Sequence, residues 1–275
     1  MSIYNTTYKS CLGASQGKTE QLFNRLDNLR YSANKTVVHV FKMEKTVVSF
    51  NDPTWSWNNG KAKHELEKDG TAIVITPTAG LDYWSKTFYE PLLIKHDAQC
   101  LLCSPIPTGV EATLTTTFTL SPRAQFDQAG IMVLVNEDTW VKAGIEYTDG
   151  VPRLSCVVTN DGYSDWSTQA WNFDNPSDDN EAKVTSIRIR VSKLFPGSNQ
   201  GPAMVFEAAP MKSLAESPSI PWTQIRIASL RSREQPWRMG LFAISPIEAA
   251  GCYARFHQVS LGPKESPVHG SKLDE

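Results

Sequence analysis

The chain has 275 residues, with 27 lysines and arginines against 29 aspartates and glutamates and a net charge of −2 at pH 7. It therefore lacks the basic surface that nucleic acid or an anionic membrane would require, and it has no apolar run of about 18 residues that could span a bilayer. The N-terminus lacks the apolar stretch of a signal peptide, and the five cysteines form an odd set, so we expect a reduced, cytoplasmic protein.

The first 42 residues differ in texture from the rest of the chain. TEQLFNRLDNLR carries Leu22, Phe23, Leu26 and Leu29 at helical spacing, which predicts a short amphipathic helix over 19–30. The nearby GASQGKT is one residue too short for a phosphate-binding loop. We expect residues 1–42 to form an extension that is dispensable for the folded domain.

From Met43 onward, short apolar segments alternate with clusters of proline, glycine, asparagine and aspartate. About ten to thirteen short strands at regular spacing, with almost no helical period, predict an all-β sandwich or barrel. The polar tail over 263–275 is expected to be flexible. The predicted strands include EKTVVSF, TAIVIT, EATLTTTFTL, QAGIMVLVN, TSIRIRVS, AMVFEAA, TQIRIASL, RMGLFAIS and CYARFHQVSLG.

The segment 139–159 predicts a β-hairpin, because Asp149-Gly150 is a strong signal for a two-residue type I′ turn. With Thr148 and Val151 beside the turn, every core-side pair is apolar and Glu146 faces Arg153. A second turn at Glu137-Asp138 adds an upstream strand. It is expected to place Leu134 beside Val141, Met132 beside Ala143 and Gly130 beside Ile145.

The second face of this hairpin carries charged and aromatic side chains whose purpose is the central question. They are Trp140, Lys142, Glu146 and Arg153, with Ile131, Val133, Val135 and Val157 between them and Gly144 leaving room above the sheet. Two neighbouring segments, expected to be loops, add Trp84 and Trp166. One interpretation is a groove for a small polar ligand or sugar; the other is that loops or the N-terminal segment simply cover this face.

FDQAGIMVLVNEDTWVKAGIEYTDGVPRLSCVVTNDGYSDWS resembles the signature segment of a family of unknown function with a concanavalin A-like β-sandwich. The yeast member of that family is named for regulation of enolase. WTQIRIASL, MGLFAISP and GCYARFHQVSL continue the resemblance, which covers about residues 44–262. It implies two curved antiparallel sheets in a jelly-roll arrangement, a shape that lectins and laminarinase-like hydrolases share, and fold alone does not fix function.

Catalytic and metal-binding patterns are weak in this sequence. Glu65, Glu67 and Asp69 share a parity, but they run into the turn at Asp69-Gly70, and Arg153 beside Glu146 should lower the pKa of that carboxyl, the wrong direction for a general acid. Two further groups are incomplete as metal sites, and we expect neither a metal nor a cofactor. They are His96, Cys100 and Cys103, and the acidic residues Asp174, Asp178, Asp179 and Glu181.

We therefore favour a cytoplasmic, non-catalytic protein of regulatory or binding type. The family resemblance links it to carbohydrate metabolism, through a metabolic enzyme such as enolase or a small sugar-like ligand. The alternative is a carbohydrate-binding protein or glycan-active enzyme that uses the concave face of the sandwich. Its ligand-binding candidates are Trp84, Trp140, Lys142, Glu146, Arg153 and Trp166.

Overall fold

The structure, a computed structural model, describes residues 43–171, 184–195, 201–211, 222–247, 251–265 and 267–269. The predicted helix over 19–30, the segment 13–19 and the acidic residues of 174–181 lie outside these ranges. The described residues form seventeen β-strands and no helix. No helix within these ranges is long and apolar enough to cross a membrane.

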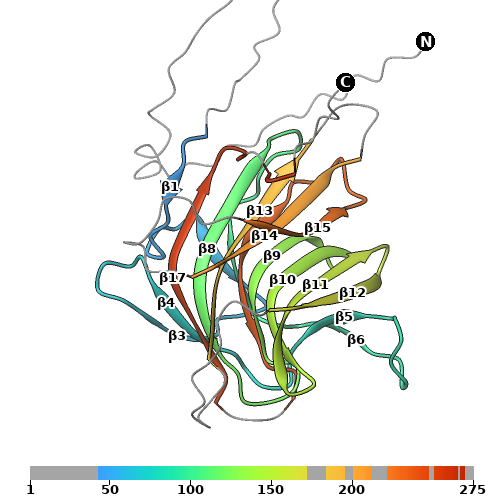
Figure 1. The fold of residues 1–275 in the computed structure, drawn as a ribbon. Helices are drawn as coiled ribbons and strands as arrows, with labels where there is room; N and C mark the ends of the chain where they lie inside the picture. Colours follow the sequence, from blue (N-terminus) through green and yellow to red (C-terminus); the bar gives the residue numbers. More distant parts are fainter. Residues whose placement is uncertain are drawn as a thin grey trace, which may run out of the picture. The chain divides into compact units, whose positions relative to one another are not determined.

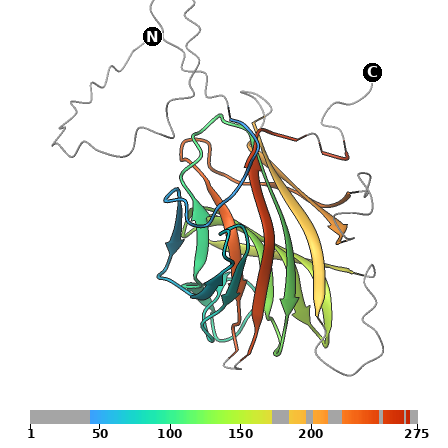
Figure 2. The same ribbon diagram turned by 90° about the vertical axis from the view of Figure 1, so that its left-hand side faces the viewer.

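The strands build two large antiparallel sheets, shown in Figures 1 and 2, and this all-β jelly-roll sandwich is the fold that the sequence predicts. One sheet has the order β15-β14-β13-β8-β17-β4-β3, with β1 paired to β17. Its strands are β1 (Thr46–Val47), β3 (Lys63–Leu66), β4 (Ile73–Thr76), β8 (Ala112–Ser121), β13 (Thr185–Leu194), β14 (Ala203–Pro210), β15 (Thr223–Ser229) and β17 (Tyr253–Gly262).

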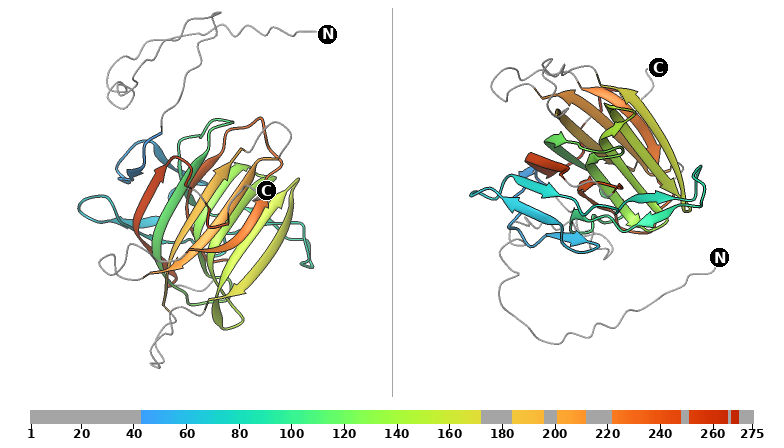
Figure 3. Two further views of the ribbon diagram at one scale, coloured as in Figure 1. Left: turned by 45° about the horizontal axis from the view of Figure 1, so that its top comes forward. Right: turned by 90° about the horizontal axis from the view of Figure 1, so that it is seen from below.

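The second sheet has the order β12-β11-β10-β9-β16-β7-β2. Figure 3 shows its strands lying in a layer behind those of the first sheet. Its members are β2 (Trp55–Asn58), β7 (Cys100–Cys103), β9 (Gln128–Asn136), β10 (Thr139–Thr148), β11 (Val151–Asn160), β12 (Tyr163–Ala170) and β16 (Arg238–Ile244). A separate two-stranded sheet pairs β5 (Tyr83–Ser85) with β6 (Ile94–His96).

The main core lies between the two large sheets because alternate residues of each strand point inward. Val141, Ala143 and Ile145 of β10 belong to it, as do Ile187, Ile189 and Val191 of β13. Each of these side chains is at most 1% exposed. The opposite face of β10 is therefore directed away from this core, and it is the face that raised the functional question.

The predicted β10–β11 hairpin is confirmed residue by residue. Ile145 pairs with Leu154, Ala143 with Cys156 and Val141 with Val158, while Glu146 faces Arg153. The turn residues Asp149 and Gly150 have φ angles of 54° and 81°, the left-handed values that a type I′ turn requires.

The predicted register of β9 against β10 is wrong by one residue. The structure pairs Val133 with Val141 and Ile131 with Ala143, because a bulge between Thr139 and Trp140 absorbs one position. Ile131 and Val133 consequently lie in the main core, and Gly130, Met132 and Leu134 share the second face with Lys142. An extra residue next to a turn leaves no mark in the alternation of apolar residues, so the pattern alone could not reveal it.

Two segments expected to be loops are strands. Trp166 lies on β12, which follows β11 through a second Asp-Gly turn at Asp161-Gly162 with φ angles of 53° and 76°. Trp84 lies on β5, whose partner β6 is only three residues long. The Asp161-Gly162 turn carries the same sequence signal as Asp149-Gly150, so β12 was predictable by the same reasoning.

Part of the expected flexible tail contacts the first sheet. The backbone N–H of Glu265 donates to Thr113, the Glu265 carboxylate pairs with Arg190, and the N–H of Val268 donates to Glu207. Residues 270–275 lie outside the described ranges. The proposed independence of residues 1–42 stays a prediction.

Candidate functional site

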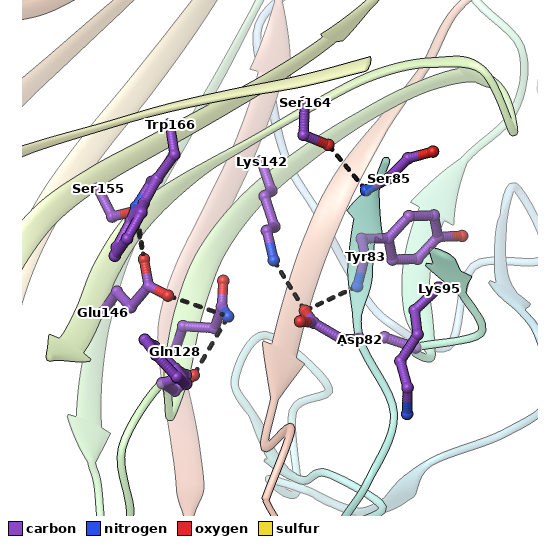
Figure 4. A network of polar contacts seen from close by, with 12 residues as sticks. Asp82, Tyr83, Ser85, Lys95, Gln128, Lys142, Glu146, Ser155, Ser164 and Trp166 are labelled. Carbon is purple, nitrogen blue, oxygen red and sulfur yellow. Dashed lines mark hydrogen bonds and ion pairs between the residues drawn. The ribbon is translucent and has the colours of Figure 1, made fainter. Parts of the chain in front are cut away.

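The second face of β10 is covered in part by the β5–β6 hairpin, which packs a second, smaller hydrophobic cluster against it. Tyr83 and Trp84 of β5 meet Met132, Trp140 and Val157 of the large sheet in this cluster. The backbone N–H of Ser85 donates to Ser164 Oγ of β12 over 2.9 Å, which fixes the hairpin to the edge strand (Figure 4). The hairpin therefore covers part of this face, and the cover ends at a cavity.

The cavity lies between the hairpin and the open part of the sheet and has a volume of about 110 Å³. Strands β10, β11 and β12 supply its floor, and the chain around β5 supplies one wall. The residues that line it combine aromatic rings with three charged groups, a composition typical of small-molecule sites. They are Asp82, Trp84, Tyr89, Leu93, Phe126, Lys142, Glu146, Val157, Trp166 and Pro246.

A buried ion pair joins the floor of the cavity to the hairpin. The Lys142 ammonium donates to Asp82 Oδ1 over 2.8 Å, and the two side chains are 3% and 13% exposed. The same Asp82 oxygen accepts the backbone N–H of Tyr83 over 2.7 Å (Figure 4). A buried charge pair of this kind gives little net stability compared with apolar packing, even with supporting hydrogen bonds.

Glu146 lies two positions beyond Gly144 on the same face and is held by three neighbouring strands. Its Oε2 accepts hydrogen bonds from Ser155 Oγ at 2.5 Å and from Trp166 Nε1 at 3.0 Å, and Gln128 Nε2 approaches Oε1 at 3.5 Å (Figure 4). Since Trp166 also donates to Ser155 over 2.9 Å, the three side chains form one network. The carboxylate is thus fixed in orientation.

The expectation of a lowered Glu146 pKa is wrong. Burial raises the pKa of this carboxyl, and the Lys142 ammonium and the Ser155 hydrogen bond oppose that effect only in part. Among the described residues no ion pair joins Glu146 to Arg153, although the two face each other in register. Residues whose Cα atoms face each other in a sheet need not have side chains in contact. Glu146 instead accepts hydrogen bonds from Ser155 and Trp166 on the buried side.

Aromatic rings form much of the remaining wall, and they stand at steep angles to one another. Trp84 meets Tyr89 with centroids 5.3 Å apart at 74° and Trp166 at 6.4 Å and 87°, and Phe126 meets Trp166 at 6.3 Å and 73°. Burial, together with the Glu146 and Asp82 carboxylates, raises the pKa of the Tyr89 hydroxyl. The four rings therefore enclose the cavity from several directions.

Four of the six predicted site residues meet in this cavity. Trp84, Lys142, Glu146 and Trp166 line it, whereas Trp140 and Arg153 do not. Trp140 is 0% exposed, packs edge-on against Tyr83 at 5.3 Å and donates to the Glu137 carbonyl, so it cannot serve as an exposed platform for a sugar. Arg153 lies half-buried near the hairpin turn.

The sequence reasoning missed five lining residues, namely Asp82, Tyr89, Leu93, Phe126 and Pro246. Asp82 directly precedes β5 and Tyr89 follows it, both within the segment LDYWSKTFYE that supplies Trp84, but only the folded hairpin shows that they turn toward Lys142. Phe126 has a φ angle of 68°, a left-handed backbone conformation that is uncommon for a bulky residue and that the surrounding sequence does not predict. Lys142, which lies too far along its strand from Glu146 to pair with it directly, was the one available signal for Asp82.

The structure brings no cluster of three or more metal-ligating side chains together within its described residues. Cys100 and Cys103 are buried thiols, and burial raises the pKa of Cys100 to about 12. A thiol with so high a pKa is a poor nucleophile at neutral pH.

Comparison with known proteins gives a family and no activity. The profile of the family described as "Protein of unknown function (DUF1349)" matches residues 57–264. "Regulation of enolase protein 1" of Saccharomyces cerevisiae is 37% identical over 116 residues, and an uncharacterized protein of Emericella nidulans is 32% identical over 90 residues. These alignments cover 42% and 31% of this chain, and the chain spans about half the length of the curated relatives it matches, 54% and 42%.

Solved structures support the fold. A functionally unknown protein from Saccharomyces cerevisiae superposes with a TM-score of 0.59 at 25% identity, covering 78% of this chain and 98% of that chain. A bifunctional GH43-CE protein of Bacteroides eggerthii superposes with a TM-score of 0.52 at 16% identity, covering 78% of this chain and 24% of that chain. At that identity the second likeness shows a shared fold alone.

Proposed function

Because the chain belongs to the DUF1349 family, whose description assigns no function, we propose one from the cavity itself: the protein binds a small polar organic ligand between the β5–β6 hairpin and strands β10–β12. The observation that carries this proposal is a second carboxylate, Glu146, buried and oriented beside the Lys142–Asp82 ion pair in an aromatic-walled cavity. A buried charge of this kind costs stability, and buried charged groups in clefts are concentrated at functional sites.

We further propose that the protein is a cytoplasmic regulator, and that ligand binding is linked to carbohydrate metabolism. The similarity to a yeast protein named for the regulation of enolase supports this link. A regulator of this type would sense a metabolite in the cavity and contact a metabolic enzyme such as enolase through another surface. This proposal requires no catalytic step.

A thermal-shift screen of the full chain tests the binding proposal. The panel contains sugars, polyols, sugar phosphates, amines and amino acids at millimolar concentration. A ligand present at 100 times its dissociation constant should add about 2.7 kcal/mol to the free energy of unfolding. Lys142→Met should abolish the shift, while Lys61→Met, at an exposed position remote from the cavity residues in sequence, should preserve it. The absence of any shift across the panel would contradict the proposal.

A second candidate function is hydrolysis of a glycoside, which one observation favours. Two carboxyl groups line one cavity, and burial raises the pKa of Glu146, the direction that a general acid requires. Aryl glycosides incubated with the protein separate this candidate from simple binding. Turnover that disappears in both Glu146→Gln and Asp82→Asn would favour an enzyme, and sustained absence of turnover alongside a thermal shift would favour a binding protein.

A further inference from the structure

The charges around the cavity disfavour an anionic ligand. The described lining residues include two carboxyl groups, Asp82 and Glu146, and one ammonium, Lys142, which already pairs with Asp82. When Glu146 is ionised, the cavity holds one negative charge in excess. A phosphate or carboxylate entering it would meet that charge in surroundings of low polarity, where repulsion is much stronger than in water.

The aromatic rings favour the opposite charge. Trp84, Tyr89, Phe126 and Trp166 line the cavity, and their pairs stand at 73° to 87° to one another. Rings at these angles form the walls of a box rather than a flat platform. The negative face of an aromatic ring attracts a cation, and several such rings around one space select methylated ammonium groups.

The orientation of Glu146 completes the arrangement. Its Oε2 is held by Ser155 and Trp166, whereas Oε1 has only the 3.5 Å contact with Gln128 among the described residues. One oxygen is therefore fixed, and the other keeps acceptor capacity in a side chain that lines the cavity. A carboxylate placed in this way is suited to balance a positive charge that arrives from outside.

We propose that the cavity binds a small methylated ammonium group, with Glu146 as its counter-ion and the four rings as its cage. This inference rests on the proposed function, because it names the class of ligand for the same cavity. A free metabolite such as a choline-like amine and a methylated lysine side chain of another protein present the same chemistry. Both are therefore compared in the test.

Calorimetric titration of the full chain with choline tests this class. The decisive comparison is with 3,3-dimethyl-1-butanol. In this compound a quaternary carbon replaces the nitrogen of choline, so that the shape is kept and the positive charge is lost. Choline should bind at least about tenfold more tightly than the carbon analogue. A trimethyllysine amide titrated in parallel shows which of the two sources fits better.

Two glutamate variants provide the matched comparison. Glu146→Gln should weaken choline binding by about tenfold or more and leave binding of the carbon analogue unchanged. Glu67→Gln removes a half-exposed carboxylate that pairs with Arg255 on the other sheet, and it should change neither ligand. Choline affinity should also rise with pH as Glu146 loses its proton, although Asp82, Lys142 and Tyr89 face the same space.

The outcomes separate this inference from the proposed function. Equal affinity for choline and its carbon analogue, or full choline affinity in Glu146→Gln, would overturn the cation site. Binding of a sugar or polyol without binding of choline would overturn it too, while the proposed small-molecule function would stand. Failure of every compound in both this titration and the thermal-shift screen would overturn both.

Discussion

Glu146 shows how a single buried carboxyl can be costly for folding and useful for binding. It is 5% exposed, and burial raises its pKa above the ordinary value of 4.5. The hydrogen bonds from Ser155 and Trp166 fix its position without fully offsetting the loss of water. The folded protein is therefore less stable when Glu146 is ionised than when it is protonated.

The stability of the protein should depend on the ionisation of Glu146. Because its pKa is higher in the folded than in the unfolded chain, its contribution to stability is fully present below about pH 4.5 and is lost as the pH rises through the folded value. Glu146→Gln keeps an oxygen that can accept from Ser155 and Trp166 but cannot ionise. We expect the variant to gain stability relative to the natural chain as the pH rises from about 4 to about 8.

Urea unfolding of both chains at several pH values measures this difference. Glu67→Gln, a change of the same type at a half-exposed carboxylate, should show no comparable gain. A stability difference between Glu146→Gln and the natural chain that stays constant across this range would contradict the expectation.

At the scale of elements, the cavity floor depends on two glycines that face each other across β9 and β10. Gly130 pairs with Gly144, and a Cβ added at Gly144 would lie 1.9 Å from the Ala129 carbonyl oxygen and 2.7 Å from Gly130 Cα. The contacting atoms are backbone, which cannot move aside as a flexible side chain can. Close approach of these strands places Lys142 and Glu146 on either side of a surface with no side chain between them.

Gly144→Ala should therefore destabilise the protein by about 3 kcal/mol, since the two strands must separate to admit the methyl group. Gly201→Ala is the matched control, because its added Cβ would meet only the Ser229 hydroxyl at an ordinary 3.4 Å. Chemical unfolding of both variants provides the measurement. Equal stability of the two variants would show that the sheet accommodates the methyl group.

The strands around this floor show what sequence reasoning can and cannot reach. The β10–β11 register followed from one Asp-Gly turn and strict alternation, because a one-residue slip would have exposed the core. The β9 register failed because the bulge at Thr139 is invisible to alternation. Asp82 and Tyr89 lay beyond reach for a different reason: they approach Lys142 through a hairpin of two three-residue strands, too short for any periodicity.

At the scale of the whole molecule, the described chain beginning at Met43 contains both large sheets and the cavity. The main core draws residues from both sheets, and among the described residues its buried members begin at Val48. Every strand of the described residues has its partner within residues 46–262, which supports the predicted dispensability of residues 1–42.

Deletion of residues 1–42 should leave a protein that is soluble and unfolds cooperatively. Its free energy of unfolding, measured with urea, should match that of the full chain within about 0.5 kcal/mol, because the deletion leaves both large sheets and the main core unchanged. Circular dichroism and fluorescence should report coincident transitions. An insoluble product, or non-coincident transitions, would show that the first 42 residues take part in folding.

The ion pair between Lys142 and Asp82 couples ligand binding in the cavity to the attachment of the β5–β6 hairpin. Asp82 lies at the base of the β5–β6 hairpin, and its contact with Lys142 helps hold that hairpin over the sheet. A ligand oxygen that accepts a hydrogen bond from Lys142 interacts with the same ammonium group that Asp82 pairs with. Ligand binding in the cavity and attachment of the hairpin are therefore thermodynamically coupled. Each changes the free energy of the other by the same amount. Amide exchange in residues 83–96 would then report, from outside the cavity, whether it is full.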